Sequence, residues 1–286
     1  MKKIRKSISR DIVGKRFQSM LSVSKTPAEC RRLLEVANKS FLEAINRAQN
    51  NQILDLSMKL EVVYYLEAVL VLKHLQRPGV VTNMTVYEWE KRVHHQHVTP
   101  ECTAYFTVIG VQLHKTLTHQ VAAFALTENE EMWFKIYYEH IRPTFLKKNS
   151  TEEAFFVSSS GKKIYKVSND LRRYHNRFNL PNITSQFIRR ICETWTMKTC
   201  SDADKYIFAS YLSHTNKTAD RCYREKILTD LCSASLLVTR AGTSSRISGQ
   251  VKNSRRRTEE PEDDFMQPQR KIRQFTRFTK QQCDDS

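Results

Sequence analysis

The feature that most constrains the fold is a stretch between residues 54 and 75 that is apolar on more than one face. A helix with one apolar stripe can lie at a surface, whereas a helix that is apolar around most of its circumference must be buried. The Arg77-Pro78-Gly79 sequence predicts the end of this helix, because proline cannot continue a helix and glycine frees the backbone. We therefore expect a central helix, with these apolar residues: Leu54, Met58, Val62, Val63, Leu66, Val69, Leu70 and Leu72.

The rest of the body reads as helical, with a small amount of strand. Residues 28–49 form an amphipathic pattern, with Thr26 as N-cap and Pro27 at the first helical position. Residues 103–126 are rich in β-branched and aromatic types, which predicts a β-hairpin with Lys115 near its tip. Residues 155–165 suggest a second small strand pair. The fold class predicted is mainly α with a small antiparallel β-sheet, and further helices are expected at 129–141, 168–178, 184–197, 202–212 and 217–235.

Composition points to an anionic partner. The 286 residues carry 47 Lys and Arg against 30 Asp and Glu, a formal net charge of +17. Nucleic acid is the common partner of such a chain, and an acidic membrane surface is the rarer one. No apolar run reaches the ~18 residues that a membrane span needs, since Glu67 interrupts the best stretch, so no membrane partner is expected.

The cysteines and histidines indicate neither a disulfide framework nor a metal site. The seven cysteines include no Cys-x-x-Cys pair, which is typical of reduced thiols inside a cell. Cys192 and Cys200 fall on one predicted helix, eight residues apart, and cannot pair locally. The polar segment with His94, His95 and His97 lacks carboxylate or Cys partners at ligand spacing, which favours a solvated loop. We expect no metal.

Candidate catalytic residues lie at characteristic intervals between residues 183 and 223. Tyr211-Leu212-Ser213-His214-Thr215 is followed by Thr218-Ala219-Asp220-Arg221-Cys222-Tyr223, so that Tyr223 lies nine residues after His214. Upstream, Ile183 to Arg190 includes Arg189. Together these segments resemble the C-terminal half of the tyrosine recombinase (phage integrase) family. That family has a helical arginine, then a Gly-His or similar pair, and the nucleophilic tyrosine nine residues later.

The resemblance extends upstream, over about residues 55–235. The family has another arginine just after an apolar helix, and a lysine in a β-hairpin between the two arginines; Arg77 and Lys115 take these positions. The Arg77–Thr85 segment and His114-Lys115-Thr116 look most like eukaryotic members related to Crypton elements. The fold is then expected to resemble the tyrosine recombinase catalytic domain.

The resemblance implies a metal-independent reaction without a cofactor. Tyr223 would attack a DNA phosphate and form a 3′-phosphotyrosine, and Lys115 would protonate the leaving 5′-oxygen. Arg77 and Arg189 would grip the non-bridging oxygens, because guanidinium matches a phosphate bidentately. His214 would donate a hydrogen bond to the phosphate, and Gln186 is a possible further phosphate contact.

Two positions depart from the family. Gln186 stands where a histidine is usual, three residues before the second arginine, and glutamine donates a hydrogen bond but cannot exchange protons at neutral pH. Val80 stands where many bacterial members have an acidic residue. An active strand-exchange enzyme and a host-adopted, catalytically weak or inactive DNA-binding protein therefore both stay open, as does an unrelated helical protein-interaction module with a basic surface.

The expected partners are double-stranded DNA and further copies of the chain. Arg172, Arg173, Arg177 and Arg190 are candidate DNA contacts as well as a candidate solvated face. Family members exchange a C-terminal helix between protomers, which predicts a homo-oligomer on DNA. Residues 1–50 are expected to be a basic segment and helix, a remnant of a DNA-clamping domain, 51–239 the catalytic domain, and 240–286 a disordered charged tail. The basic clusters of that tail suggest the nucleus if the source is eukaryotic, and otherwise an intracellular location.

Overall fold

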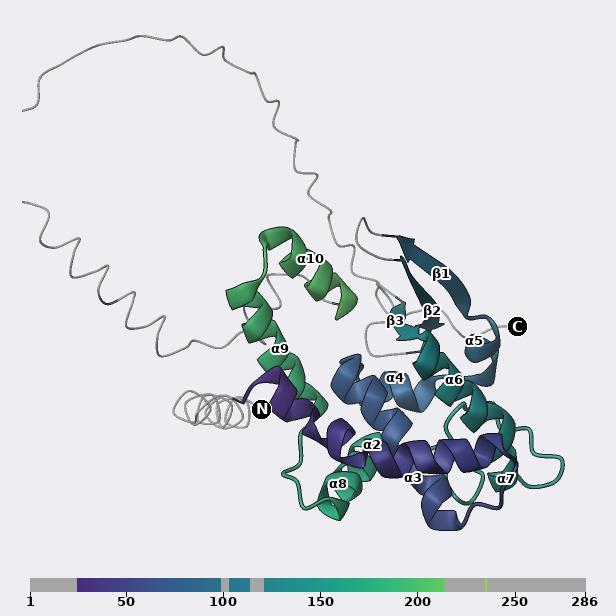
Figure 1. The fold of residues 1–286 in the computed structure, drawn as a ribbon. Coiled ribbons are helices and arrows are strands. Elements are labelled where there is room, and N and C mark those ends of the chain that lie inside the picture. Colours follow the sequence, from purple (N-terminus) through teal and green to yellow (C-terminus); the bar gives the residue numbers. More distant parts are fainter. Residues whose placement is uncertain (1–24, 99–102, 114–120, 214–234, 236–286) are drawn as a thin grey trace, which may run out of the picture. The chain divides into compact units, whose positions relative to one another are not determined.

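A computed structural model describes residues 25–98, 103–113, 121–213 and 235, all of which fall within one compact unit, Met1–Ser235. This unit is mostly helical and contains a small three-stranded antiparallel sheet, which confirms the predicted fold class (Figure 1). Among the described residues, no helix is both long and apolar enough to cross a membrane.

Helix α2, Pro27–Gln49, forms as the sequence predicts. Thr26 caps it, since its hydroxyl accepts from the Glu29 amide at 3.2 Å while the Glu29 carboxylate accepts from the Thr26 amide at 2.6 Å. This capping box fixes where the helix begins. One face packs against α3 and α9 and is buried through Cys30, Leu33, Ala37, Phe41, Ala44, Ile45 and Ala48.

The central helix is α3, Leu56–Ala68, continued by a π-helical turn, η1, Val69–Lys73. Every residue from Tyr65 to Leu72 is buried, as the apolar pattern predicts. The helix ends two residues before the predicted end at residue 75, but Arg77-Pro78-Gly79 is not what terminates it. The helix stops at Lys73, and Arg77 precedes a new short helix, α4, Pro78–Asn83, of which Pro78 is the first residue. Proline's fixed φ suits a first turn, where its missing N–H is not needed.

Glu67 lies inside this apolar helix and is fully buried. None of the described side chains lies within hydrogen-bond distance of its carboxyl oxygens. Burial, with a smaller effect from the Asp170 carboxylate, raises the pKa of Glu67 well above its ordinary value. Burial therefore favours the neutral form of the side chain, which costs less in the core than a carboxylate would.

The sheet comprises β1, Val93–Val98, β2, Thr103–Val111, and β3, Ala122–Thr127, in the order β1-β2-β3. The β2–β3 hairpin confirms the prediction, with Val111 opposite Ala122. Lys115 lies in residues 114–120, outside the described residues. The loop predicted around the histidines was wrong, because His94, His95 and His97 all lie on β1. This strand has both faces exposed, so it shows no alternation of apolar and polar residues.

The second strand pair was also wrong. Residues 155–165 contain only an isolated bridge between Val157 and Lys163. Phe155, Phe156 and Val157 are all buried, so this segment does not have the one buried and one exposed face of an edge strand. They pack against aromatic rings of neighbouring helices, including Phe134 and Tyr137.

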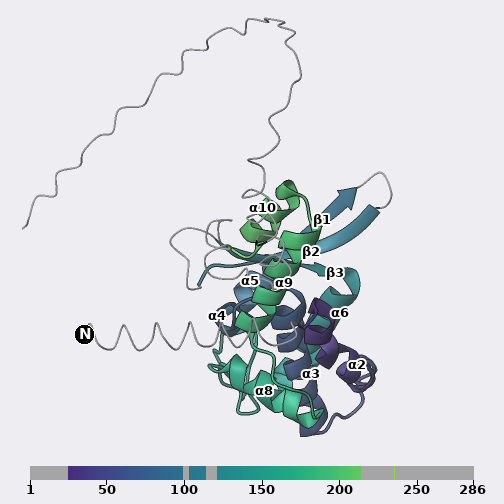
Figure 2. The same ribbon diagram turned by 90° about the vertical axis from the view of Figure 1, so that its left-hand side faces the viewer.

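The remaining described elements are helical. Predicted helices are confirmed as α6, Glu128–Ile136, with the π-helical η2, Tyr137–Ile141; α8, Val167–Arg177; α9, Ser185–Thr199; and α10, Asp202–Tyr211. Two short helices, α5, Val86–Glu90, and α7, Arg142–Phe145, complete them. Except for Ser235, the helix expected at 217–235 lies outside the described residues. Both views place α10 at the end of the unit that carries the sheet, and α10 contacts β3 (Figures 1 and 2).

A buried carboxylate connects the central helix to α6. Glu130, in the first turn of α6, accepts from Lys73 Nζ at 2.7 Å and lies 3.2 Å from His74 Nε2. Burial opposes ionisation, but the contacts with His74, Lys73 and the Thr127 amide outweigh it and lower the pKa of Glu130 to about 2. The carboxylate thus fixes the last residues of the central helix.

We expect Glu130→Gln to lower stability at pH 7 by about 2–3 kcal/mol, since each pKa unit corresponds to about 1.4 kcal/mol. A depressed folded-state pKa gives stability that is present above the ordinary value of 4.5 and lost as pH falls towards 2. Thermal unfolding between pH 7 and 2 should show the wild type and the variant converging at low pH. The exposed neighbour variant Glu128→Gln is the control. Parallel curves for wild type and Glu130→Gln would contradict this account.

Candidate functional site

The centre of the candidate site is the buried guanidinium of Arg189, on the second turn of α9. Its Nη1 donates to the Leu75 carbonyl at 2.6 Å and its Nη2 to the Leu212 carbonyl at 2.7 Å. Charged donors form the stronger class of hydrogen bond, above all when water is excluded. Arg189 therefore holds together the chain two residues before Arg77 and the chain two residues before His214.

The connection between η1 and α4, residues 74–77, is held from several sides. Leu75 adopts a left-handed backbone with φ of 56°, which is uncommon for a residue other than glycine. The carbonyl of Gln76 accepts from Ser185 Oγ at 3.2 Å, which connects it to the start of α9. Arg77 follows at once, and its side chain is half-buried. The position of Arg77 is thus set by bonds to its two preceding residues.

The described residues before and after segment 114–120 are anchored near Arg77. At the end of β2, Asn83 Nδ2 donates to the Leu113 carbonyl at 3.0 Å. Next to it, the Gln112 amide donates to the Glu88 carboxylate at 2.8 Å. At the start of β3, the Ala123 carbonyl accepts from Gln76 Nε2 at 3.4 Å. The segment 114–120 therefore leaves and re-enters the described chain beside α4 and residues 74–77.

Ser213, the residue before His214, has an uncommon backbone conformation. It adopts φ of 56°, and its amide donates to the Ser210 carbonyl at 2.8 Å to close the turn after α10. This left-handed region favours glycine and is uncommon for a residue with a side chain. His214 and Tyr223 lie outside the described residues. Their convergence with Lys115 on one phosphate stays a prediction.

The structure gives the predicted phosphate ligands unequal access. Arg189 is 2% exposed and its guanidinium is directed at two carbonyls, whereas Arg77 is half-buried at the surface of α4. Gln186 is exposed on the first turn of α9, and Arg190 lies half-buried with its guanidinium 5.8 Å from the Phe187 ring centroid. The hydrogen bond from Arg189 to the Leu75 carbonyl thus joins α9 to the main chain just before Arg77.

The arginines on α8 differ in their partners. Arg173 pairs with Asp170 at 3.0 Å, and Arg177 pairs with the buried Glu61 at 2.9 Å. Arg172 is exposed and has no ion pair with any described residue. The predicted DNA contacts on this helix are therefore partly neutralised by carboxylates, with Arg172 the exception.

Sequence reasoning missed the residues that arrange the site. Gln76, Asn83 and Ser185 each bond to the main chain of a distant segment. Gln76 gave a weak signal, since it is a polar residue at the end of the most apolar stretch. Asn83 and Ser185 gave no signal of their own, because their bonds join segments far apart in the sequence.

No protein-family model matches the chain, and no curated protein matches it. Among solved structures, the chain is similar to the crystal structure of XerA recombinase, with 13% sequence identity and a TM-score of 0.48. The alignment covers 76% of this chain, and the chain spans about 65% of the length of that structure.

We expect Arg189→Lys to lower the free energy of unfolding by about 2–4 kcal/mol. A lysine ammonium cannot span both carbonyls, so at least one buried acceptor is left without a partner, at a cost of about 1–3 kcal/mol, in addition to the lost charged bond. Urea denaturation measures the difference. The exposed Arg172→Lys should stay within about 0.5 kcal/mol of wild type. An Arg189→Lys protein as stable as wild type would show that the two carbonyl bonds do not hold the fold.

Proposed function

We propose that the chain is a tyrosine recombinase-like, DNA-binding protein that cuts and rejoins DNA through a 3′-phosphotyrosine. The observation that carries the proposal is the pair of hydrogen bonds from Arg189 to the carbonyls of Leu75 and Leu212, which precede Arg77 and His214. Arg77, Arg189 and His214 were chosen from sequence motifs, and residues 75 and 189 are 114 positions apart. A protein-interaction module would give no reason for their segments to meet.

The proposed chemistry balances without a further reactant. The Tyr223 phenol gives its proton to solvent water and its oxygen bonds to phosphorus, while the bond from phosphorus to the 5′-oxygen breaks. Lys115 supplies a proton to that oxygen as it leaves. Arg77 and Arg189 stabilise the second negative charge that the phosphate gains, and preorganised cations of this kind are often the largest catalytic contribution. The covalent intermediate keeps the bond energy for religation.

Access of Arg189 to a phosphate requires a rearrangement, because its guanidinium is occupied by two carbonyls. Anionic oxygens are stronger acceptors than carbonyls, so phosphate can compete for the same donors. Arg77 needs no such change, because its side chain is partly exposed.

A second candidate is a host-adopted protein that keeps the fold and binds DNA without cutting it. Gln186 favours it, because an exposed amide replaces the histidine that the resemblance leads one to expect. The burial of Arg189 favours it as well. Membership of the Crypton-related branch and a nuclear location remain predictions of the sequence.

The experiment uses a pool of nicked duplexes of randomised sequence. After cleavage, the short 5′-hydroxyl fragment diffuses away, and its loss prevents religation, so that the covalent adduct accumulates. We expect wild type to form a covalent adduct that survives denaturation, with the phosphonucleotide on the peptide containing residue 223. Tyr223→Phe should form none, and Tyr206→Phe, an exposed tyrosine on α10, should react as wild type. An adduct with Tyr223→Phe would refute the nucleophile. Salt-dependent DNA binding without an adduct would select the second candidate.

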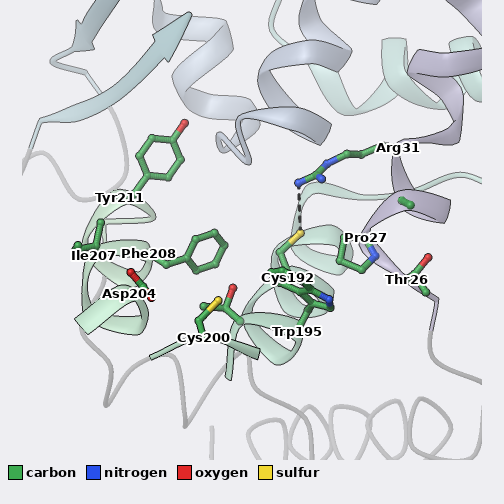
Figure 3. A pocket seen from close by; sticks show the side chains of 12 residues that line it. Thr26, Pro27, Arg31, Cys192, Trp195, Cys200, Asp204, Ile207, Phe208 and Tyr211 are labelled. Atoms are coloured by element: carbon green, nitrogen blue, oxygen red, sulfur yellow. Dashed lines mark hydrogen bonds between the residues drawn. The ribbon is translucent and has the colours of Figure 1, made fainter. Parts of the chain in front are cut away.

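An apolar groove supports the proposed oligomer. A hollow of about 660 Å³ lies between the start of α2, the second half of α9, and α10 (Figure 3). Trp195 and Ile207 line it and are 50% and 64% exposed, large values for apolar side chains. Such a patch is typical of an interaction site. The occupant that we propose is the apolar sequence of a second copy that contains Ile227, Leu228, Leu231, Leu236 and Leu237.

We expect Trp195→Glu to abolish oligomers on DNA while leaving the monomer folded, because a carboxylate in the groove opposes burial of an apolar segment. Leu231→Glu, on the other side of the proposed contact, should have the same effect. Tyr206→Glu is the matched control, since Tyr206 is exposed on α10 but does not line the groove. Sedimentation velocity with duplex DNA measures the oligomer. Oligomers that persist in both Trp195→Glu and Leu231→Glu would contradict this contact.

A further inference from the structure

The connection that leads into Arg77 stores backbone strain. The central helix ends in the π-helical turn η1, where the His74 amide bonds to the Val69 carbonyl at 3.0 Å. Leu75 then adopts its left-handed φ of 56° with a buried side chain. Such a conformation persists only where surrounding contacts over-determine it, and π-turns often occur at functional sites.

Among the described residues of the connection, Gln76 forms the most hydrogen bonds to neighbouring segments. It is 4% exposed, and its Nε2 donates to the Ala123 carbonyl of β3 at 3.4 Å and to the His74 carbonyl at 3.1 Å. Its main-chain amide donates to the Leu70 carbonyl at 2.9 Å, while its own carbonyl accepts from Ser185. A single residue thus joins the end of the central helix to β3 and α9.

The Gln76 amide also faces α10. Burial raises the pKa of the Tyr211 phenol to about 12, and a polar contact with Gln76 opposes this rise. Tyr211 precedes the Leu212 carbonyl that Arg189 holds. The elements around Gln76, the residue before Arg77, are therefore strand β3, helix α9, which carries Arg189, and the end of α10.

We propose that Gln76 is a positioning residue, which fixes the place of Arg77 relative to β3, α9 and the end of α10 without itself touching the phosphate. This inference rests on the proposed function. The amide is the group required, because its two N–H donors reach two carbonyls on different segments. Methionine matches its length and volume but donates nothing, and glutamate offers only acceptors to the same carbonyls.

The first test is independent of catalysis and uses the full-length chain with orthovanadate as a phosphate mimic. The Arg77 Nε–Hε signal is followed by NMR in protein with labelled arginine, and is assigned through its loss in Arg77→Lys. We expect a saturable shift in wild type and at least tenfold weaker affinity in Gln76→Met. Gln49→Met, an exposed glutamine of α2, should bind as wild type.

The second test separates positioning from a general loss of stability. Phe41→Leu perturbs the buried face of α2 far from residues 74–77 in the sequence and should lower the melting temperature. It should keep wild-type vanadate affinity, whereas Gln76→Met should not. The rate of adduct formation with nicked DNA should fall at least tenfold in Gln76→Met and stay near wild type in Gln49→Met, under conditions where all of these proteins are folded.

The outcomes are distinct. If wild type forms no adduct while Gln76→Met still loses vanadate affinity, the strand-exchange proposal fails and the positioning role stands. If Gln76→Met only melts earlier and matches wild type in vanadate affinity, Gln76 is merely structural and the inference is overturned. An Arg77 signal that does not respond to vanadate in wild type also overturns it.

Discussion

The buried guanidinium of Arg189 is the interaction on which the candidate site depends. A cation in the interior is tolerated only where it is fully engaged, and two main-chain carbonyls, 114 and 23 residues away in the sequence, accept from its terminal nitrogens. These bonds force three segments to meet at one place. They also mean that the residue best placed to organise the site is almost fully buried, at 2% exposed.

Around this point the structure uses polar groups within a largely apolar interior. Glu130 neutralises Lys73 and contacts His74 at the end of the central helix, and Gln76 joins the same helix end to β3 and α9. Buried polar networks of this kind define one arrangement when their members are satisfied, because every misplaced bond costs more in a low dielectric. The left-handed Leu75 lies between these contacts, and they hold it in place.

The distribution of charge limits what the basic composition can mean. Among the described residues, Arg173, Arg177 and Lys73 are paired with carboxylates, while Arg172 is exposed and Arg77 half-buried. If the chain binds DNA as proposed, arginines released from these pairs would contribute less than their number suggests, since each gives up a partner to meet a phosphate.

The sequence by itself determined the fold class, the central buried helix, α2 with its capping box, the helices α8 to α10 and the β2–β3 hairpin, because periodicity and caps are local properties. It could not determine β1, which has no buried face, or the irregular path of residues 155–165, where Phe155 and Phe156 are buried against the aromatic rings of Phe134 and Tyr137. Only the tertiary structure decided that the Arg189 guanidinium donates to two main-chain carbonyls and that Gln76 connects the central helix to β3 and α9. Those outcomes depend on hydrogen bonds between residues far apart in the chain, and no local pattern encodes them.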